Sequence, residues 1–222
     1  MIYSFANPKG GVGKSTLSVH FVTWLSEQGG KVVLVDADSQ GSSSTWLREA
    51  APEIPIELLV TPDELLEGLG KLSLQFDHVV VDAPGVLADT IRCILLKTDV
   101  ALLPCGPSAL ELRTAFDAVR VLKQVQDIRG GPPMSFLVPN RIKTRQRLSK
   151  DFMDAATTLG IPTTSGLRDL QAYADAPGQA TVVWKMGPRA ADASQDIQQL
   201  FKEIIANVST SETFDDRRVE NG

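Results

Sequence analysis

A glycine-rich loop near the start of the chain carries the strongest chemical signal in the sequence. It runs from Asn7 to Thr16 with the letters NPKGGVGKST, after a short apolar run and before a segment with helical spacing of apolar residues. Glycines let backbone amides close around phosphate oxygens, because no Cβ obstructs the approach. A helix that starts at the end of the loop directs its positive end at the same oxygens. The pattern therefore predicts a phosphate-binding loop.

The side chains of this loop have separate expected roles. Lys14 reaches the β- and γ-phosphates of a nucleotide, and the Ser15 hydroxyl is a ligand for Mg²⁺. Further cofactor contacts are expected from Gly10, Gly11, Val12, Gly13 and Thr16. The loop departs from the usual G-x-x-x-x-G-K-[ST] pattern, because Pro8 stands where the first glycine is expected. The alternative is a turn that only packs tightly, but the flanking strand and helix and the three glycines favour the phosphate site.

Acidic side chains follow two later apolar runs. Asp36 and Asp38 are two residues apart, so in an extended segment both point to one side, toward a shared metal–phosphate site. Helix capping is the alternative for this pair, since Asp is common at that position. Asp82 ends the run HVVVD, and an aspartate at a strand end can hold Mg²⁺, in this case through water.

The elements that must position these residues alternate along the chain. Apolar, β-rich runs cover residues 2–6, 31–36, 56–60, 78–82, 100–104 and 134–139, with weaker ones near 161–164 and 181–184. Helical spacing covers residues 14–28, 42–50, 62–69, 89–97, 109–128, 145–159 and 189–207. Continuous apolar strands are typical of a sheet that helices cover on both faces. We therefore expect an α/β fold with a single doubly wound, mostly parallel sheet, which binds ligands at the carboxyl ends of its strands.

Composition and charge agree with a globular chain. The 222 residues are 43% hydrophobic and 22% charged, which excludes collagen-like and disordered classes. We interpret Cys93 and Cys105 as small core residues of a cytosolic protein. No apolar run reaches the ~18 residues of a membrane-spanning helix, and the first residues lack the pattern of a secretory signal. The net charge of −5 does not favour nucleic-acid binding, although residues 141–150 hold five cations and no acid.

The letters KGGVGKST, with Lys9 inside the loop, resemble the deviant Walker A motif of the ParA/MinD family of ATPases. The resemblance extends over roughly residues 1–205 and implies a P-loop ATPase in which two protomers enclose two ATP molecules. It implies that Lys9 acts in trans on the partner's nucleotide, as an arginine finger does. The letters DADSQG resemble the family's switch I, with Ser39 where proline is common. By that match Asp38 orients the attacking water and Asp36 helps to organise the Mg²⁺ shell.

Two further segments receive roles from the resemblance. Residues 83–85 are expected to form switch II, which lies close to the γ-phosphate and changes shape when that group leaves. Asn140 and Arg141 follow a later strand at a position that often supplies adenine contacts in the family. The Asn140 amide has the donor and acceptor needed to read a purine edge. An ordinary asparagine-containing turn is the alternative for this segment.

The resemblance also implies partners. Partition members of the family bind DNA without sequence preference as ATP-bound dimers, through phosphate contacts of basic residues. The candidates here are Arg145, Arg147, Lys150, Arg168, Lys185 and Arg189. For each of them a solvated helix surface is the alternative. We expect a slow, cytoplasmic, nucleoid-associated ATPase that an accessory activator or cargo adaptor stimulates, with a plasmid, a chromosome locus or a protein assembly as cargo.

The expected organisation is a ParA-like ATPase domain over residues 1–208 and a polar, flexible tail over residues 209–222. This tail lacks the apolar face of a membrane-docking helix, so no membrane partner is expected. The loop starts at Asn7, so no preceding helix-turn-helix is expected. The alternative function is that of a biosynthetic ATP-dependent ligase of the dethiobiotin-synthetase-like or cobyrinate-amidation-like type, which would need a pocket for a second substrate.

Overall fold

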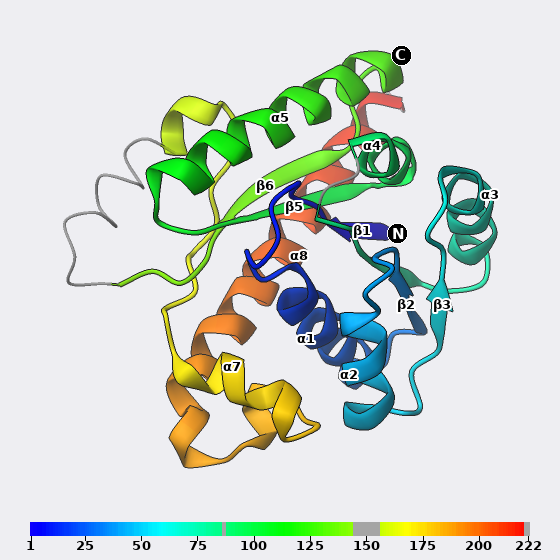
Figure 1. Ribbon diagram of the computed structural model, residues 1–222. Coiled ribbons are helices and arrows are strands. Elements are labelled where there is room, and N and C mark those ends of the chain that lie inside the picture. Colours follow the sequence, from blue (N-terminus) through cyan, green and yellow to red (C-terminus); the bar gives the residue numbers. More distant parts are fainter. Residues whose placement is uncertain (86–87, 144–155, 220–222) are drawn as a thin grey trace.

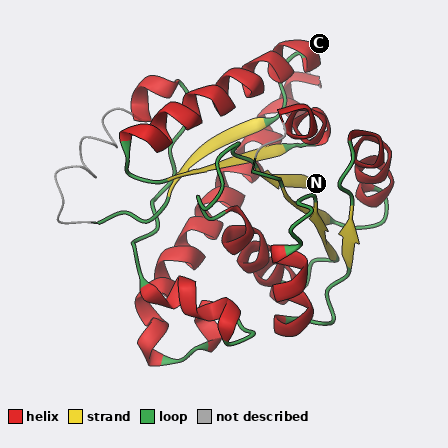
Figure 2. Ribbon diagram, viewed as in Figure 1, coloured by secondary structure: helices red, strands yellow, loops and turns green. Residues whose placement is uncertain are grey.

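Six parallel strands form one sheet between two layers of helices (Figure 2). The computed structural model describes residues 1–85, 88–143 and 156–219. The strand order is β3-β2-β4-β1-β5-β6, and each neighbouring pair is parallel. The strands are β1 (Ile2–Phe5), β2 (Val32–Asp36), β3 (Ile56–Leu58), β4 (His78–Asp82), β5 (Val100–Cys105) and β6 (Met134–Pro139). The predicted fold class is confirmed.

The helices follow the strands along the chain and lie on both sides of the sheet (Figure 1). They are α1 (Lys14–Glu27), α2 (Ser42–Ala50), α3 (Pro62–Ser73), α4 (Ala88–Lys97), α5 (Ala109–Arg129), α7 (Gln171–Gly178) and α8 (Ala191–Val219). Short 3₁₀ turns are η1 (Thr157–Leu159), η2 (Val183–Lys185) and η3 (Pro188–Ala190). None of these helices is both long enough and apolar enough to cross a bilayer, within the residues that the structure describes.

Each face of the sheet has its own hydrophobic core. Successive strand residues point to opposite faces, so in β4 the side chain of Val80 enters one core while Val79 and Val81 enter the other. The first core is shared with α1, α2, α7 and α8, and the second with α3, α4 and α5. This double burial explains why the strands are apolar at every position. Cys105 is buried in the second core, as expected, whereas Cys93 is only partly buried and lies in neither core.

The carboxy-terminal third differs most from the expectation. Residues 181–184, expected as a weak strand, lead instead into the 3₁₀ turn η2. The weak run at 161–164 makes only one isolated bridge, between Leu137 and Thr163. Helix α7 was not expected, and most of the expected helix 145–159 lies outside the described residues. Helix α8 continues to Val219, past residue 209 where the flexible tail was expected to begin.

A buried histidine explains why η2 is not a strand. His20 of α1 is fully buried, and its Nε2 accepts a hydrogen bond from the Val183 backbone amide at 3.1 Å. Its Nδ1 therefore carries the proton and donates to the Thr16 carbonyl at 2.7 Å. Burial lowers the pKa of His20 to about 4, so the ring is neutral near pH 7. The Val183 amide thus donates its hydrogen bond to the His20 side chain of α1 and not to the backbone of a neighbouring strand.

Helix α1 is also bound to the carboxy-terminal part of the chain at its carboxyl end. Glu27, in the last turn of α1, accepts a hydrogen bond from Trp184 Nε1 at 2.8 Å. The same carboxylate forms an ion pair with Lys185 at 2.8 Å. The helix that follows the glycine-rich loop is therefore attached to η2 at its middle, through His20, and at its carboxyl end, through Glu27.

Candidate nucleotide site

The glycine-rich loop lies between β1 and α1, and its shape requires glycine. Gly11 and Gly13 have φ angles of 73° and 99°, a left-handed conformation that other residues rarely adopt. A Cβ on Gly13 would lie 2.2 Å from Nδ2 of Asn140, so a larger residue there would have to displace the Asn140 amide. Val12 between them is fully buried, which fixes the loop on the protein. The predicted loop, with Lys14 as the first residue of α1, is present.

Lys14 extends back over this loop. Its ammonium donates a hydrogen bond to the Lys9 carbonyl at 3.0 Å, and the side chain is buried. Burial lowers the pKa of Lys14, while the negative charges of Asp82 and Asp38 act in the opposite direction. The structure therefore brings the loop lysine and two of the predicted acids together at one site.

Asp82 is the most unusual carboxylate of this site. Both of its oxygens are buried, and neither accepts a hydrogen bond from a described residue. Burial raises the pKa of Asp82 to about 6, although the Ser15 and Ser43 hydroxyls and the Lys14 ammonium favour the charged form. A buried carboxylate without a partner is costly, so the position calls for a cation. Asp82 and the Ser15 hydroxyl fit a Mg²⁺ ion, which prefers carboxylate and hydroxyl oxygens and keeps several waters.

Asp36 and Asp38 have different surroundings. Asp36 is fully buried and accepts hydrogen bonds from the amides of Ser44, at 2.9 Å, and Asp38, at 3.1 Å. It therefore holds the loop after β2 against the first turn of α2, although the cap residue of that helix is Gly41. Asp38 is half-buried, and its carboxylate accepts a hydrogen bond from the Gln40 amide at 3.0 Å.

A hollow of about 440 Å³ lies beside Asp38 and is also lined by Gly10, Pro84 and Gly85. A Cβ on Gly85 would lie 3.4 Å from the backbone of Gly10, so the segment expected as switch II reaches the glycine-rich loop. Residues 86 and 87 lie outside the described residues. The hollow has the position needed for a terminal phosphate and a water, between the loop and Asp38.

A second hollow, of about 180 Å³, lies on the other side of the loop. Gly13, Thr16, Asn140, Arg141 and Tyr173 are among the residues that line it. The Asn140 amide donates to the Val12 carbonyl at 2.7 Å and accepts from the Arg141 amide at 2.9 Å. Asn140 and Arg141 thus lie beside the glycine-rich loop, with the Asn140 side chain bound to the loop backbone. The adenine contacts expected of both residues stay a prediction.

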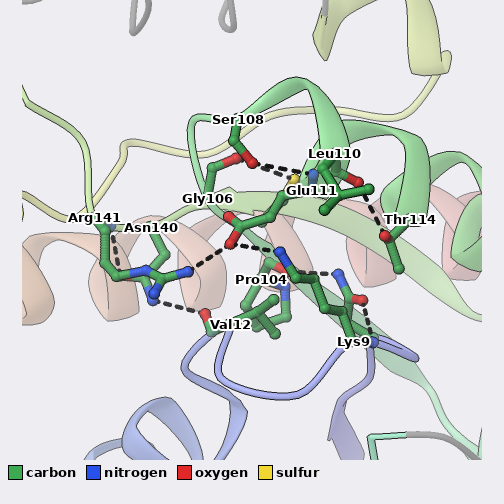
Figure 3. A network of polar contacts seen from close by, with 12 residues as sticks. Lys9, Val12, Pro104, Gly106, Ser108, Leu110, Glu111, Thr114, Asn140 and Arg141 are labelled. Carbon is green, nitrogen blue, oxygen red and sulfur yellow. Dashed lines mark hydrogen bonds and ion pairs between the residues drawn. The ribbon is translucent and has the colours of Figure 1, made fainter.

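Lys9 belongs to a polar network that the sequence did not reveal (Figure 3). Its ammonium lies 2.9 Å from Oε1 of Glu111, and the Arg141 guanidinium lies 2.8 Å from the same oxygen. Glu111 stands three residues after Ser108, and this S-x-x-E spacing is also that of a helix cap. Sequence reasoning had no reason to assign Glu111 to the site.

The comparison with family models decides the family. The model described as "CobQ/CobB/MinD/ParA nucleotide binding domain" matches residues 3–183. The chain belongs to this family.

Individual relatives of this CobQ/CobB/MinD/ParA member agree with that assignment. It is 30% identical over 207 residues to "Maintenance of carboxysome distribution protein A" of Halothiobacillus neapolitanus, covering 90% of this chain and 94% of the relative. The solved ATP complex of a Cyanothece McdA variant has a TM-score of 0.77 at 16% identity, over 94% of this chain and 96% of that one. MinD of Pyrococcus horikoshii with Mg-ADP has a TM-score of 0.72 at 20% identity, over 91% and 95%. At these identities, the two structures support the fold.

The basic residues of this family member that were expected to contact DNA have varied surroundings. Arg145, Arg147 and Lys150 lie outside the described residues. Arg168 binds both carboxylate oxygens of Asp196, at 2.7 and 2.9 Å, and this pairing raises the pKa of the guanidinium. Lys185 pairs with Glu27, whereas Arg189 is exposed and borders a hollow of about 290 Å³ beside α7.

Proposed function

We propose that this protein is an ATP-hydrolysing switch that dimerises when it binds ATP, binds DNA without sequence preference and positions a cargo. The observation that carries the proposal is the unpartnered, buried carboxylate of Asp82 beside Lys14 and Ser15, at the end of a glycine-rich loop. A Mg²⁺–nucleotide supplies the missing positive charge for Asp82 and the missing anion for Lys14. Membership of the family and the ATP and Mg-ADP complexes of structural relatives support the same ligand.

The side chains of the site have distinct proposed roles. Lys14 binds the β- and γ-phosphates, and Ser15 and Asp82 hold Mg²⁺, which neutralises phosphate charge when bound. Asp38 faces the hollow beside Gly10 and orients the attacking water there. Asp36 supports this geometry by binding the amide of Asp38. Lys9 of one protomer stabilises charge on the partner's transferring phosphoryl group.

The relative from Halothiobacillus is named for the distribution of carboxysomes, so a large protein assembly is our first choice of cargo, ahead of a plasmid or a chromosome locus. A cytoplasmic, nucleoid-associated location follows from the proposed DNA binding. Such a system needs an adaptor protein that links the ATPase to its cargo and stimulates hydrolysis. Exposed Arg189, and the candidates Arg168 and Lys185 once their ion pairs open, are available for phosphate contacts.

Two substitutions test the proposal. Lys14→Ala should abolish binding of ATP and, with it, dimerisation and DNA binding, measured by calorimetry, sedimentation and fluorescence anisotropy. Asp38→Ala should bind ATP, dimerise and bind DNA, while hydrolysis falls about 100-fold or more. Asp127→Ala, which removes an exposed carboxylate on α5, is the matched control and should behave as wild type. Normal hydrolysis by Asp38→Ala, or ATP binding without dimerisation by wild type, would contradict the proposal.

An enzyme of the ligase alternative has a similar fold. A cobyrinic acid a,c-diamide synthase of Mycobacterium smegmatis, solved with ADP and magnesium, has a TM-score of 0.62 at 23% identity, over 85% of this chain and 96% of that one. A ligase couples ATP consumption to a carboxylate substrate, whereas the proposed switch hydrolyses ATP with DNA and an adaptor protein. ATP turnover that depends on an added small carboxylic acid would favour the ligase.

A further inference from the structure

Glu111 occupies the third position of α5 but does not cap that helix with its side chain. Its amide donates to the Ser108 hydroxyl at 3.2 Å, which is one half of a capping box. Its carboxylate points away from the helix toward the glycine-rich loop, where Oε1 accepts from Lys9 and Arg141 (Figure 3). Glu111 therefore stands at a capping position, but its carboxylate binds Lys9 and Arg141 instead of the helix end.

The three partners of this network differ in burial. The Glu111 side chain is 11% exposed, against 30% for Lys9 and 44% for Arg141. Its second oxygen, Oε2, is buried without a hydrogen-bond partner among the described residues. A Cβ on Gly106 would overlap this oxygen, so glycine makes the room that the carboxylate occupies. The carboxylate is therefore the most buried member of the network, and its two cations are more exposed.

Lys9 is held at three points within its own protomer. Its amide donates to Asn7 Oδ1 at 2.9 Å, its carbonyl accepts from Lys14 Nζ at 3.0 Å, and its ammonium pairs with Glu111 at 2.9 Å. The bond from Lys14 competes with the phosphates of a nucleotide for the same ammonium. Phosphate binding therefore frees the Lys9 carbonyl, but it does not by itself break the ion pair with Glu111.

We propose that Glu111 is a positioning residue that competes, within one protomer, against the partner's nucleotide for the Lys9 side chain. This rests on the proposed function of Lys9 in the dimer. Breaking the ion pair costs free energy, so Glu111 raises the ATP concentration at which dimers form. Arg141 makes the exchange reversible, because it stays on Glu111 Oε1 and leaves the buried carboxylate with a counter-charge after Lys9 departs.

The first test measures whether Glu111 confines Lys9. Acylation of lysines by an N-hydroxysuccinimide ester, followed by mass spectrometry, reports how accessible each ammonium is. Lys9 should react several-fold faster in Glu111→Gln than in wild type, and faster in wild type as salt screens the pair. Exposed Lys71 is the internal reference, and Glu64→Gln, at the same position of helix α3, is the matched control. Unchanged Lys9 reactivity in both the variant and the salt series overturns the proposal.

The second test measures the consequence for assembly. Sedimentation over an ATP series should show that Glu111→Gln dimerises at roughly tenfold lower ATP than wild type, as expected for losing one charged hydrogen bond. A merely destabilised variant would dimerise less readily, so this direction separates positioning from a structural role. An equal or higher ATP requirement in Glu111→Gln overturns the proposal. If no variant and no wild-type protein dimerises, the proposed function has failed, whereas the acylation result still reports whether Glu111 confines Lys9.

Discussion

Helices α3 and α5 begin with the same sequence pattern and use it differently. Thr61 and Ser108 both stand three residues before a glutamate, and each hydroxyl accepts a hydrogen bond from the glutamate amide, at 3.3 and 3.2 Å. In α3 the Glu64 carboxylate accepts a hydrogen bond from the Thr61 amide at 3.0 Å, which completes a capping box. In α5 the Glu111 carboxylate instead binds two cations at the glycine-rich loop.

The comparison shows that the same S/T-x-x-E pattern leads to different contacts, depending on the burial of the glutamate and the charges near it. Glu64 is exposed at the protein surface, where the nearest donors are those of its own helix end. Glu111 follows the carboxyl end of β5, the edge of the sheet where the glycine-rich loop also lies, and it is buried. A buried carboxylate needs positive charge more than a helix needs a second capping bond, so Glu111 binds Lys9 and Arg141.

The largest expected effect on stability comes from removing the carboxylates of Glu111 and Glu64 in turn. Glu111→Ala should lower the free energy of unfolding by about 1–3 kcal/mol, because two charge-assisted hydrogen bonds are lost at a buried position. Glu64→Ala removes only solvent-exposed capping bonds and should lower the free energy of unfolding by less than Glu111→Ala does. Urea unfolding of both variants, without nucleotide, makes the comparison. Equal losses would show that the two glutamates are used alike.

A smaller effect on stability is expected from removing the capping hydroxyls of Thr61 and Ser108. Thr61→Ala and Ser108→Ala should each cost about 1 kcal/mol, because each removes one bond to a helix amide. Similar urea midpoints for the two variants would place the difference between the helices in their glutamates. A much larger loss for Ser108→Ala would mean that the hydroxyl also supports the Glu111 network.

The smallest effect is the pH dependence of the exposed cap. Hydrogen bonds from the backbone and side chain of Thr61 lower the pKa of Glu64 below its ordinary value of 4.5. The charged cap therefore stabilises α3 above that ordinary pKa, and this stabilisation disappears as the pH falls through the lowered pKa. In an NMR titration, Thr61→Ala should move the Glu64 midpoint upward. A midpoint that does not change would show that the Thr61 hydroxyl does not contribute to the lowered pKa of Glu64 in solution.

The sheet and the glycine-rich loop were predictable because their signals are local. Continuous apolar runs gave β4 and β6 their observed bounds, since strands buried on both faces need apolar residues throughout. The loop followed from glycines whose φ angles other residues rarely adopt, such as Gly11 and Gly13. The acids of the site followed from the carboxyl ends of β2 and β4, because parallel strands all end at one edge of the sheet.

The remaining features depend on contacts between distant residues. Val183 was expected in a strand because it is apolar, but its amide is bound by His20, which lies 163 positions earlier. Helix α7 contains Pro177, a residue that argues against a helix when only the sequence is known. Glu111 carries a capping pattern, and only the fold brings Lys9, 102 positions away, to its carboxylate. The spacing of neighbouring residues in the sequence indicates none of these features.

The attachment of α1 to η2 has a mechanical consequence. The 14 residues of α1 form a stiff rod about 20 Å long, with Lys14 at one end and the Glu27–Lys185 contact near the other. A displacement of this helix must therefore either move Lys185 as well or break the hydrogen bonds that His20 and Glu27 accept from η2. The residue that binds phosphate and the residues of η2 are therefore connected through a single rigid helix.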